Sequence, residues 1–177
     1  MERNKDIKIY SIGKKFLIER LKEKGKNEDL LFRHLEPKIK FNDLKEVYLR
    51  LLESGANRSL MWNVITSPLN GEIRNLEKVL FDFDVFLVLK KYSTPEKILE
   101  DLVRIFDLKI NLDKRGLWFQ YSTTILSGAK FLSQFDNFRD FDNFVRFFHK
   151  DNRARKALPL LLKEEINGFG LALACDF

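Results

Sequence analysis

The chain has 177 residues, 45% of them hydrophobic, and a formal net charge of +6, so it is long enough to bury the core of one ordinary domain. Its single cysteine excludes an intramolecular disulfide and a thiolate metal cluster. The longest apolar run, Val85–Leu89, is far too short to cross a bilayer, and the charged first residues are not a secretory signal. We therefore expect a cytoplasmic protein that uses no membrane, metal or cofactor.

The positive charge is unevenly distributed. Residues 1–60 hold fifteen basic and ten acidic residues, whereas the two signs cancel over residues 61–149. From Lys150 to Lys163, five basic residues stand against one acidic residue. A modest basic balance of this kind is compatible with a nucleic-acid partner.

In the first half of the chain, apolar spacing and stop signals predict short helices. The expected ranges are residues 7–24, 27–35, 42–55, 57–65 and 71–80. We expect Asn42 to cap the third of these, with Glu46 placed to bond back toward it. The alternating run Phe81–Val85 is also typical of a strand, but a lone strand would have no partner. We therefore expect Asp82 or Asp84 to cap a helix that runs through Leu89.

In the second half, Thr94-Pro95-Glu96 is a strong signal for a helix that begins there and buries apolar residues up to Phe106. After a polar connection, further helices are expected over residues 117–131, 140–148, 154–166 and 171–177. Asp140 or Asp142 is the expected cap of the second of these, and Pro159 is expected to interrupt the third. The predicted fold class is all-α, an orthogonal multi-helix array forming one domain over residues 1–177.

Phenylalanines recur every three or four residues between Phe131 and Phe148. Such a stripe is typical of a helix face in the core, although base stacking or a protein partner is also compatible with it. No P-loop, nucleophile elbow or nuclease metal motif occurs elsewhere in the chain. The sequence therefore predicts no catalytic residue.

The most informative segment is Ile166–Ala174, where two glycines flank Phe169. Gly168 and Gly170 permit a left-handed or tightly curved backbone, and Phe169 can point back into the core. The amides that begin the following helix would then face a phosphate. The predicted DNA-binding residues are Asn167, Gly168, Phe169, Gly170, Leu171 and Ala172, with Arg153, Arg155 and Lys156 of the preceding basic segment.

This helix–turn–helix pattern resembles the helix-hairpin-helix superfamily of base-excision DNA glycosylases and lyases. Thr123–Gly128 is similar to a segment that this family places at the damaged-base end of its cleft. The resemblance covers residues 117–177 and implies a grip on double-stranded DNA, with N-glycosidic hydrolysis as the activity of a full-length protein. Gly128 stands where the family has Gln, so that side chain's role does not carry over.

The family's catalytic Asp does not carry over either, because Asp176 lies too close to the turn. The position matching the lyase Lys holds an apolar or small residue. We therefore expect this chain alone to be inactive, and its apolar last residues suggest a reading frame that continues past Phe177. The alternative function is an α-helical interaction or scaffold module, in which Gly-Phe-Gly is only a turn between helices.

Overall fold

The computed structural model describes residues 2–26, 41–58, 61–110 and 116–176. Contacts divide the chain into two units, residues 1–40 and residues 41–177, where the sequence predicts a single domain. The first unit contains α1 (Glu2–Glu23), which covers the helix predicted over residues 7–24. Ile7, Phe16 and Leu17 of this helix are exposed. The helix predicted over residues 27–35 lies outside the described residues.

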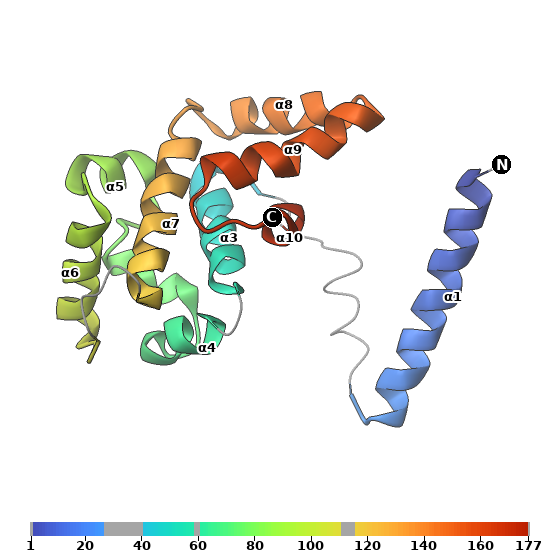
Figure 1. Ribbon diagram of the computed structural model, residues 1–177, viewed down its shortest axis with the longest axis horizontal. Coiled ribbons are helices and arrows are strands. Elements are labelled where there is room, and N and C mark those ends of the chain that lie inside the picture. The colour runs from blue at the N-terminus through green and yellow to red at the C-terminus, as the bar shows by residue number, and fades with distance from the viewer. Residues whose placement is uncertain (1, 27–40, 59–60, 111–115, 177) are drawn as a thin grey trace. The chain divides into compact units, whose positions relative to one another are not determined.

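The second unit contains the other helices of the described ranges (Figure 1). In chain order they are α3 (Leu44–Ala56), α4 (Met61–Thr66), the 3₁₀ helices η1 (Ser67–Leu69) and η2 (Ile73–Lys78), α5 (Val85–Lys91), α6 (Pro95–Phe106), α7 (Leu117–Leu132), α8 (Phe138–His149), α9 (Asn152–Glu165) and α10 (Leu171–Asp176). Every regular element in the described ranges is a helix, which confirms the all-α class. None of these helices is both long enough and apolar enough to span a membrane.

Helix α7 is the centre of the second unit, since α3, α5 and α6 all pack against it (Figure 1). Two buried tyrosines tie α3 to α7 in opposite directions. The Tyr48 hydroxyl donates to the Ile125 carbonyl at 2.7 Å, and the Tyr121 hydroxyl donates to the Leu52 carbonyl at 3.0 Å. Gly128 allows this close approach, because a Cβ there would lie 2.7 Å from Cδ2 of Leu51.

Several predicted helix starts need correction by a few residues. Asp43 caps α3 instead of Asn42, although the Glu46 carboxylate does accept from the Asn42 amide at 2.7 Å. Asn137 caps α8 instead of Asp140 or Asp142, because its side chain already accepts from the Asp140 amide, one turn earlier than predicted. Asp84 caps α5, which confirms one of the two predicted caps and the helix boundary there.

The chain turns sharply before α5 through three consecutive left-handed residues. Phe81, Asp82 and Phe83 have φ of 52°, 54° and 59°, a region that costs a residue with a Cβ about 1–2 kcal/mol. Burial of Phe83 against Tyr48, with ring centroids 6.4 Å apart, compensates part of this strain. The alternation that resembled a strand is therefore a compact turn.

Helices α8 and α9 lie side by side (Figure 1). Pro159 lies inside α9, which continues through it, so the predicted interruption is wrong. Pro159 removes one backbone hydrogen bond from the helix. Burial of Leu162 and packing of Leu158 against the core outweigh this loss, so the helix continues. Phenylalanines of the stripe pack against one another. Phe131 and Phe144, for example, form an edge-to-face pair whose ring centroids are 6.2 Å apart.

Candidate nucleic-acid interface

The Gly-Phe-Gly turn follows Ile166, the residue directly after the end of α9. Gly168 has φ of 91°, and the Phe169 amide donates to the Ile166 carbonyl at 3.0 Å, so the chain reverses within three residues. Phe169 is buried, as the sequence predicts. Its ring lies against the last turn of α3, where a Cβ added to Gly55 would be 3.6 Å from Cε1 of Phe169. The turn is therefore anchored in the core by its central side chain.

Two hydroxyls of α7 hold the backbone of the same turn. The Thr124 hydroxyl donates to the Asn167 carbonyl at 2.7 Å, and the Asn167 amide donates to Oγ of Ser127 at 3.0 Å. Both hydroxyls are on side chains with less than a tenth of their surface exposed. Asn167 is thus fixed through both of its main-chain groups, which makes the turn rigid before any ligand arrives.

These hydroxyls belong to Thr123–Gly128, the segment that the resemblance places at the damaged-base end of a cleft. In the structure this segment lies in the core of the second unit. Thr124 and Ser127 contact the turn, and Gly128 contacts α3. Its sequence is explained by packing and hydrogen bonding within the fold.

The two glycines of the turn have different roles, although the sequence predicts the same role for both. A Cβ on Gly168 would lie 2.6 Å from Oγ1 of Thr124, in a backbone conformation that side chains rarely adopt. Gly170 has no positive φ, and a Cβ there would meet nothing within 4 Å. The fold therefore requires the first glycine but not the second, and the prediction of a special backbone conformation at Gly170 is wrong.

Arg58 lies beside the turn, although it was not among the predicted DNA-binding residues. It follows the end of α3, and its Nη1 atom is 3.4 Å from where a Cβ of Gly168 would be. Arg58 is exposed, and its side chain has no hydrogen-bond or ion-pair partner within the described part of the chain. The one hint was the small-residue run Ser54-Gly55-Ala56, which lets another segment approach the end of α3.

The predicted cations of α9 lie at its other end. Arg153 precedes Ile166 by thirteen residues, which corresponds to about 20 Å along a helix. Arg153, Arg155 and Lys156 are all exposed. Arg155 also lines a cavity and donates from Nη2 to the His149 carbonyl at 3.4 Å. The structure therefore does not bring the basic segment and the turn together into one cluster.

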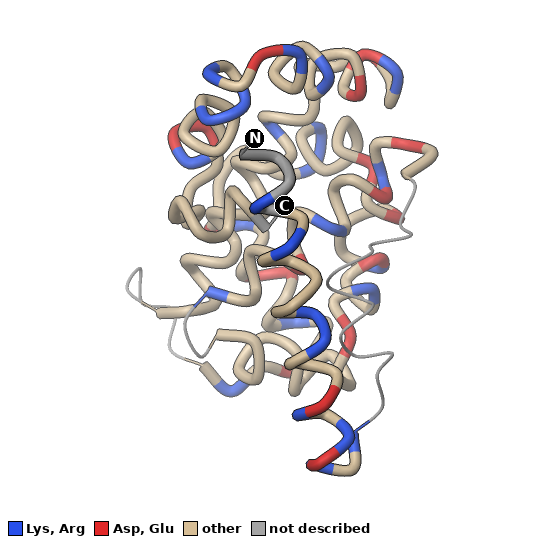
Figure 2. Tube along the Cα trace, turned by 90° about the vertical axis from the view of Figure 1, so that its right-hand side faces the viewer, with Lys and Arg blue, Asp and Glu red and all other residues tan. Residues whose placement is uncertain are grey.

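Acidic groups accompany both ends of α9. Asp151 caps the helix, and hydrogen bonds from the amides of Ala154 and Arg153 lower the pKa of its carboxyl. At the other end, Oε1 of Glu164 lies 3.6 Å from Nζ of Lys163. Glu165 is exposed next to the turn. Figure 2 shows the two signs of charge interspersed along the trace. The cations near the turn are Arg58, beside Gly168, and Lys130, which lines a cavity with Glu165 and Asn167.

The exposed surface of the turn is formed mainly by main chain and small side chains. Asn167, Gly170, Leu171 and Ala172 are exposed, and Gly168 is partly exposed. Within the described ranges, no three His, Cys, Asp or Glu side chains gather closely enough to hold a metal ion. What this surface offers chemically is backbone polar groups beside one guanidinium.

Comparisons with protein-family models, with curated proteins and with solved structures found no match. The likeness to helix-hairpin-helix glycosylases therefore rests on the sequence motifs alone.

Proposed function

We propose that this protein binds the phosphate backbone of double-stranded DNA at the Gly-Phe-Gly turn. The observation that carries the proposal is the guanidinium of Arg58, which has no partner among the described residues and lies beside a turn whose second glycine the fold does not need. A Cβ at Gly170 would meet no atom of the described residues within 4 Å. Its absence leaves the main chain of residues 170–172 open to close approach by another molecule.

The rigidity of the turn supports this proposal. Thr124 and Ser127 fix the main chain of Asn167, and burial of Phe169 fixes the following residue. A backbone held in place loses little conformational entropy when a phosphate binds to it. Contacts of this kind position a protein on a duplex without reading the base sequence. We propose binding only, and we assign no reaction to this chain.

The proposal can be tested by fluorescence anisotropy with a labelled duplex of about 20 base pairs, at about 50 and 200 mM salt. Loss of one charge-assisted hydrogen bond to phosphate should weaken binding about tenfold. We expect this for Arg58→Gln and for Gly170→Ala, the second because the new methyl group keeps the phosphate away.

The matched control is Arg139→Gln. Arg139 lines a groove with the residues that begin α3, whereas the turn packs on the end of that thirteen-residue helix. The two arginines are therefore separated by roughly the length of α3, about 20 Å. If Arg58→Gln and Gly170→Ala bind the duplex as tightly as Arg139→Gln does, the turn is not the interface.

The alternative function, an interaction module, has one structural feature in its favour. A groove with mainly apolar walls lies between α8, α9 and α10, on the side of α9 that carries Leu158 and Leu162. The groove does not include the residues of the Gly-Phe-Gly turn. Variants of the turn therefore test DNA binding without altering this second surface.

A further inference from the structure

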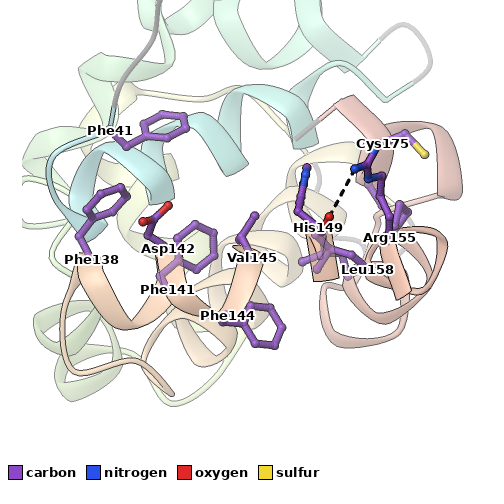
Figure 3. A pocket seen from close by; sticks show the side chains of 13 residues that line it. Phe41, Phe138, Phe141, Asp142, Phe144, Val145, His149, Arg155, Leu158 and Cys175 are labelled. Carbon is purple, nitrogen blue, oxygen red and sulfur yellow. Dashed lines mark hydrogen bonds between the residues drawn. The ribbon is translucent and has the colours of Figure 1, made fainter. Parts of the chain in front are cut away.

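The groove between α8, α9 and α10 is a cavity of about 390 Å³ (Figure 3). Protein sites for small ligands usually have volumes of about 300–1,000 Å³, with apolar walls and a few polar groups. The apolar walls are formed by Phe41, Phe138, Phe141, Phe144, Val145 and Leu158, among others. The cavity lies wholly within the second unit.

One end of this cavity is aromatic and holds no net charge. Phe138 and Phe141 lie there next to Asp142 (Figure 3). The Asp142 carboxylate accepts from Nε of Arg146 at 2.6 Å, so its negative charge is balanced by a cation on the same helix. An apolar group is the ligand part that this end accommodates best.

The opposite end is cationic. Arg155, His149 and Cys175 lie together there (Figure 3). Arg155 donates from Nη2 to the His149 carbonyl at a long 3.4 Å, and it forms no ion pair with a carboxylate in the described part of the chain. A guanidinium has five N–H donors, so most of those of Arg155 remain available to an anion. Among the described residues that line this end of the cavity, none carries a carboxylate.

From this arrangement we infer that the cavity binds a small amphipathic anion, a molecule with an apolar body and one carboxylate or phosphate head group. The apolar body lies among the phenylalanines, and the head group accepts hydrogen bonds from Arg155. In the reversed orientation the head group would lie among phenylalanines and would lose the hydrogen bonds from Arg155. This binding site is independent of the DNA interface, because the two surfaces share no residue of the turn.

Isothermal titration with decanoate tests the inference, and the chain's single cysteine reports the location. Cys175 is exposed and lines the cationic end. Bound decanoate should therefore slow alkylation of Cys175 by iodoacetamide in proportion to occupancy. Octanoate, with two methylenes fewer, should bind about 15-fold more weakly. Decyl phosphate in a parallel titration distinguishes the two head groups, and tight binding of either anion supports the site.

Arg155→Gln should weaken decanoate binding about tenfold, as expected for one charge-assisted hydrogen bond at a partly exposed site. Arg153→Gln, an exposed arginine of the same helix that does not line the cavity, should leave the affinity unchanged. The inference is overturned if neither decanoate nor decyl phosphate binds, if the bound anion does not protect Cys175, or if decyltrimethylammonium binds more tightly than both anions. It is also overturned if the two arginine variants have equal affinity.

Discussion

Replacing Gly168 with alanine should destabilise the protein because of two features of the structure. The φ of 91° disfavours any residue with a Cβ by about 1–2 kcal/mol. The new methyl group would also lie 2.6 Å from Oγ1 of Thr124 and push that hydroxyl away from the Asn167 carbonyl. Loss of this hydrogen bond adds about 1 kcal/mol. We therefore expect Gly168→Ala to lower the free energy of unfolding by about 2–3 kcal/mol.

Urea denaturation followed by circular dichroism measures this change, and Gly170→Ala is the matched control two residues away. That substitution meets no atom within 4 Å and needs no unusual backbone, so it should change stability by no more than about 0.5 kcal/mol. The contact term is isolated by repeating Gly168→Ala in a Thr124→Ala background. Without the threonine hydroxyl the cost should fall by about 1 kcal/mol.

The reasoning is refuted if Gly168→Ala is no more destabilising than Gly170→Ala. The argument from the contact with Thr124 is refuted if Gly168→Ala lowers the free energy of unfolding equally with and without the Thr124 hydroxyl. In that case the backbone conformation alone would account for the effect.

Three further predictions concern the tyrosines, the caps and the charge near the turn. Burial raises the pKa of Tyr48 and Tyr121, so their contribution to stability is complete below the unfolded-state value of about 10 and is lost as the pH rises above it. Urea unfolding should therefore give a free energy that falls above about pH 10, and a constant value up to about pH 11 would contradict this. Asn137→Ala should lower the free energy of unfolding by about 1 kcal/mol through loss of the α8 cap, whereas Asp142→Ala should lower it by no more than about 0.5 kcal/mol. Equal losses of stability in thermal unfolding would contradict the assignment of Asn137 as the cap. Glu165→Gln removes a negative charge beside the turn and should tighten duplex binding about twofold at low salt, so weaker binding in the anisotropy assay would count against that placement.

The parts of the fold that could be predicted are those that local sequence determines. The start of α6 at Thr94-Pro95 and the cap Asp84 each depend on residues within a few positions. Each wrongly predicted cap lies one to five positions from the polar residue that caps the helix in the structure. At those sites the choice depends on packing of the whole helix, which local preference does not determine.

The parts of the candidate site that could not be predicted depend on contacts between distant segments. Arg58 and Gly168 are 110 positions apart, and no local pattern indicates that they meet. Gly168 and Gly170 cannot be distinguished by sequence, since only the contact with Thr124 makes one of them indispensable. Arg155 belongs to the same basic segment as Arg153, yet it lines the cavity, because the cavity exists only once α8 packs on α9.

The most direct test of the proposed interface is the salt dependence of duplex binding by the wild type and by Arg58→Gln. For duplex DNA, the logarithm of the binding constant falls with the logarithm of salt concentration by about 0.9 for each phosphate neutralised. If Arg58 contacts a phosphate beside the turn, the slope for Arg58→Gln should be shallower by about 0.9, while Arg139→Gln keeps the wild-type slope. Identical slopes for the wild type and Arg58→Gln would contradict the proposal that the turn binds DNA.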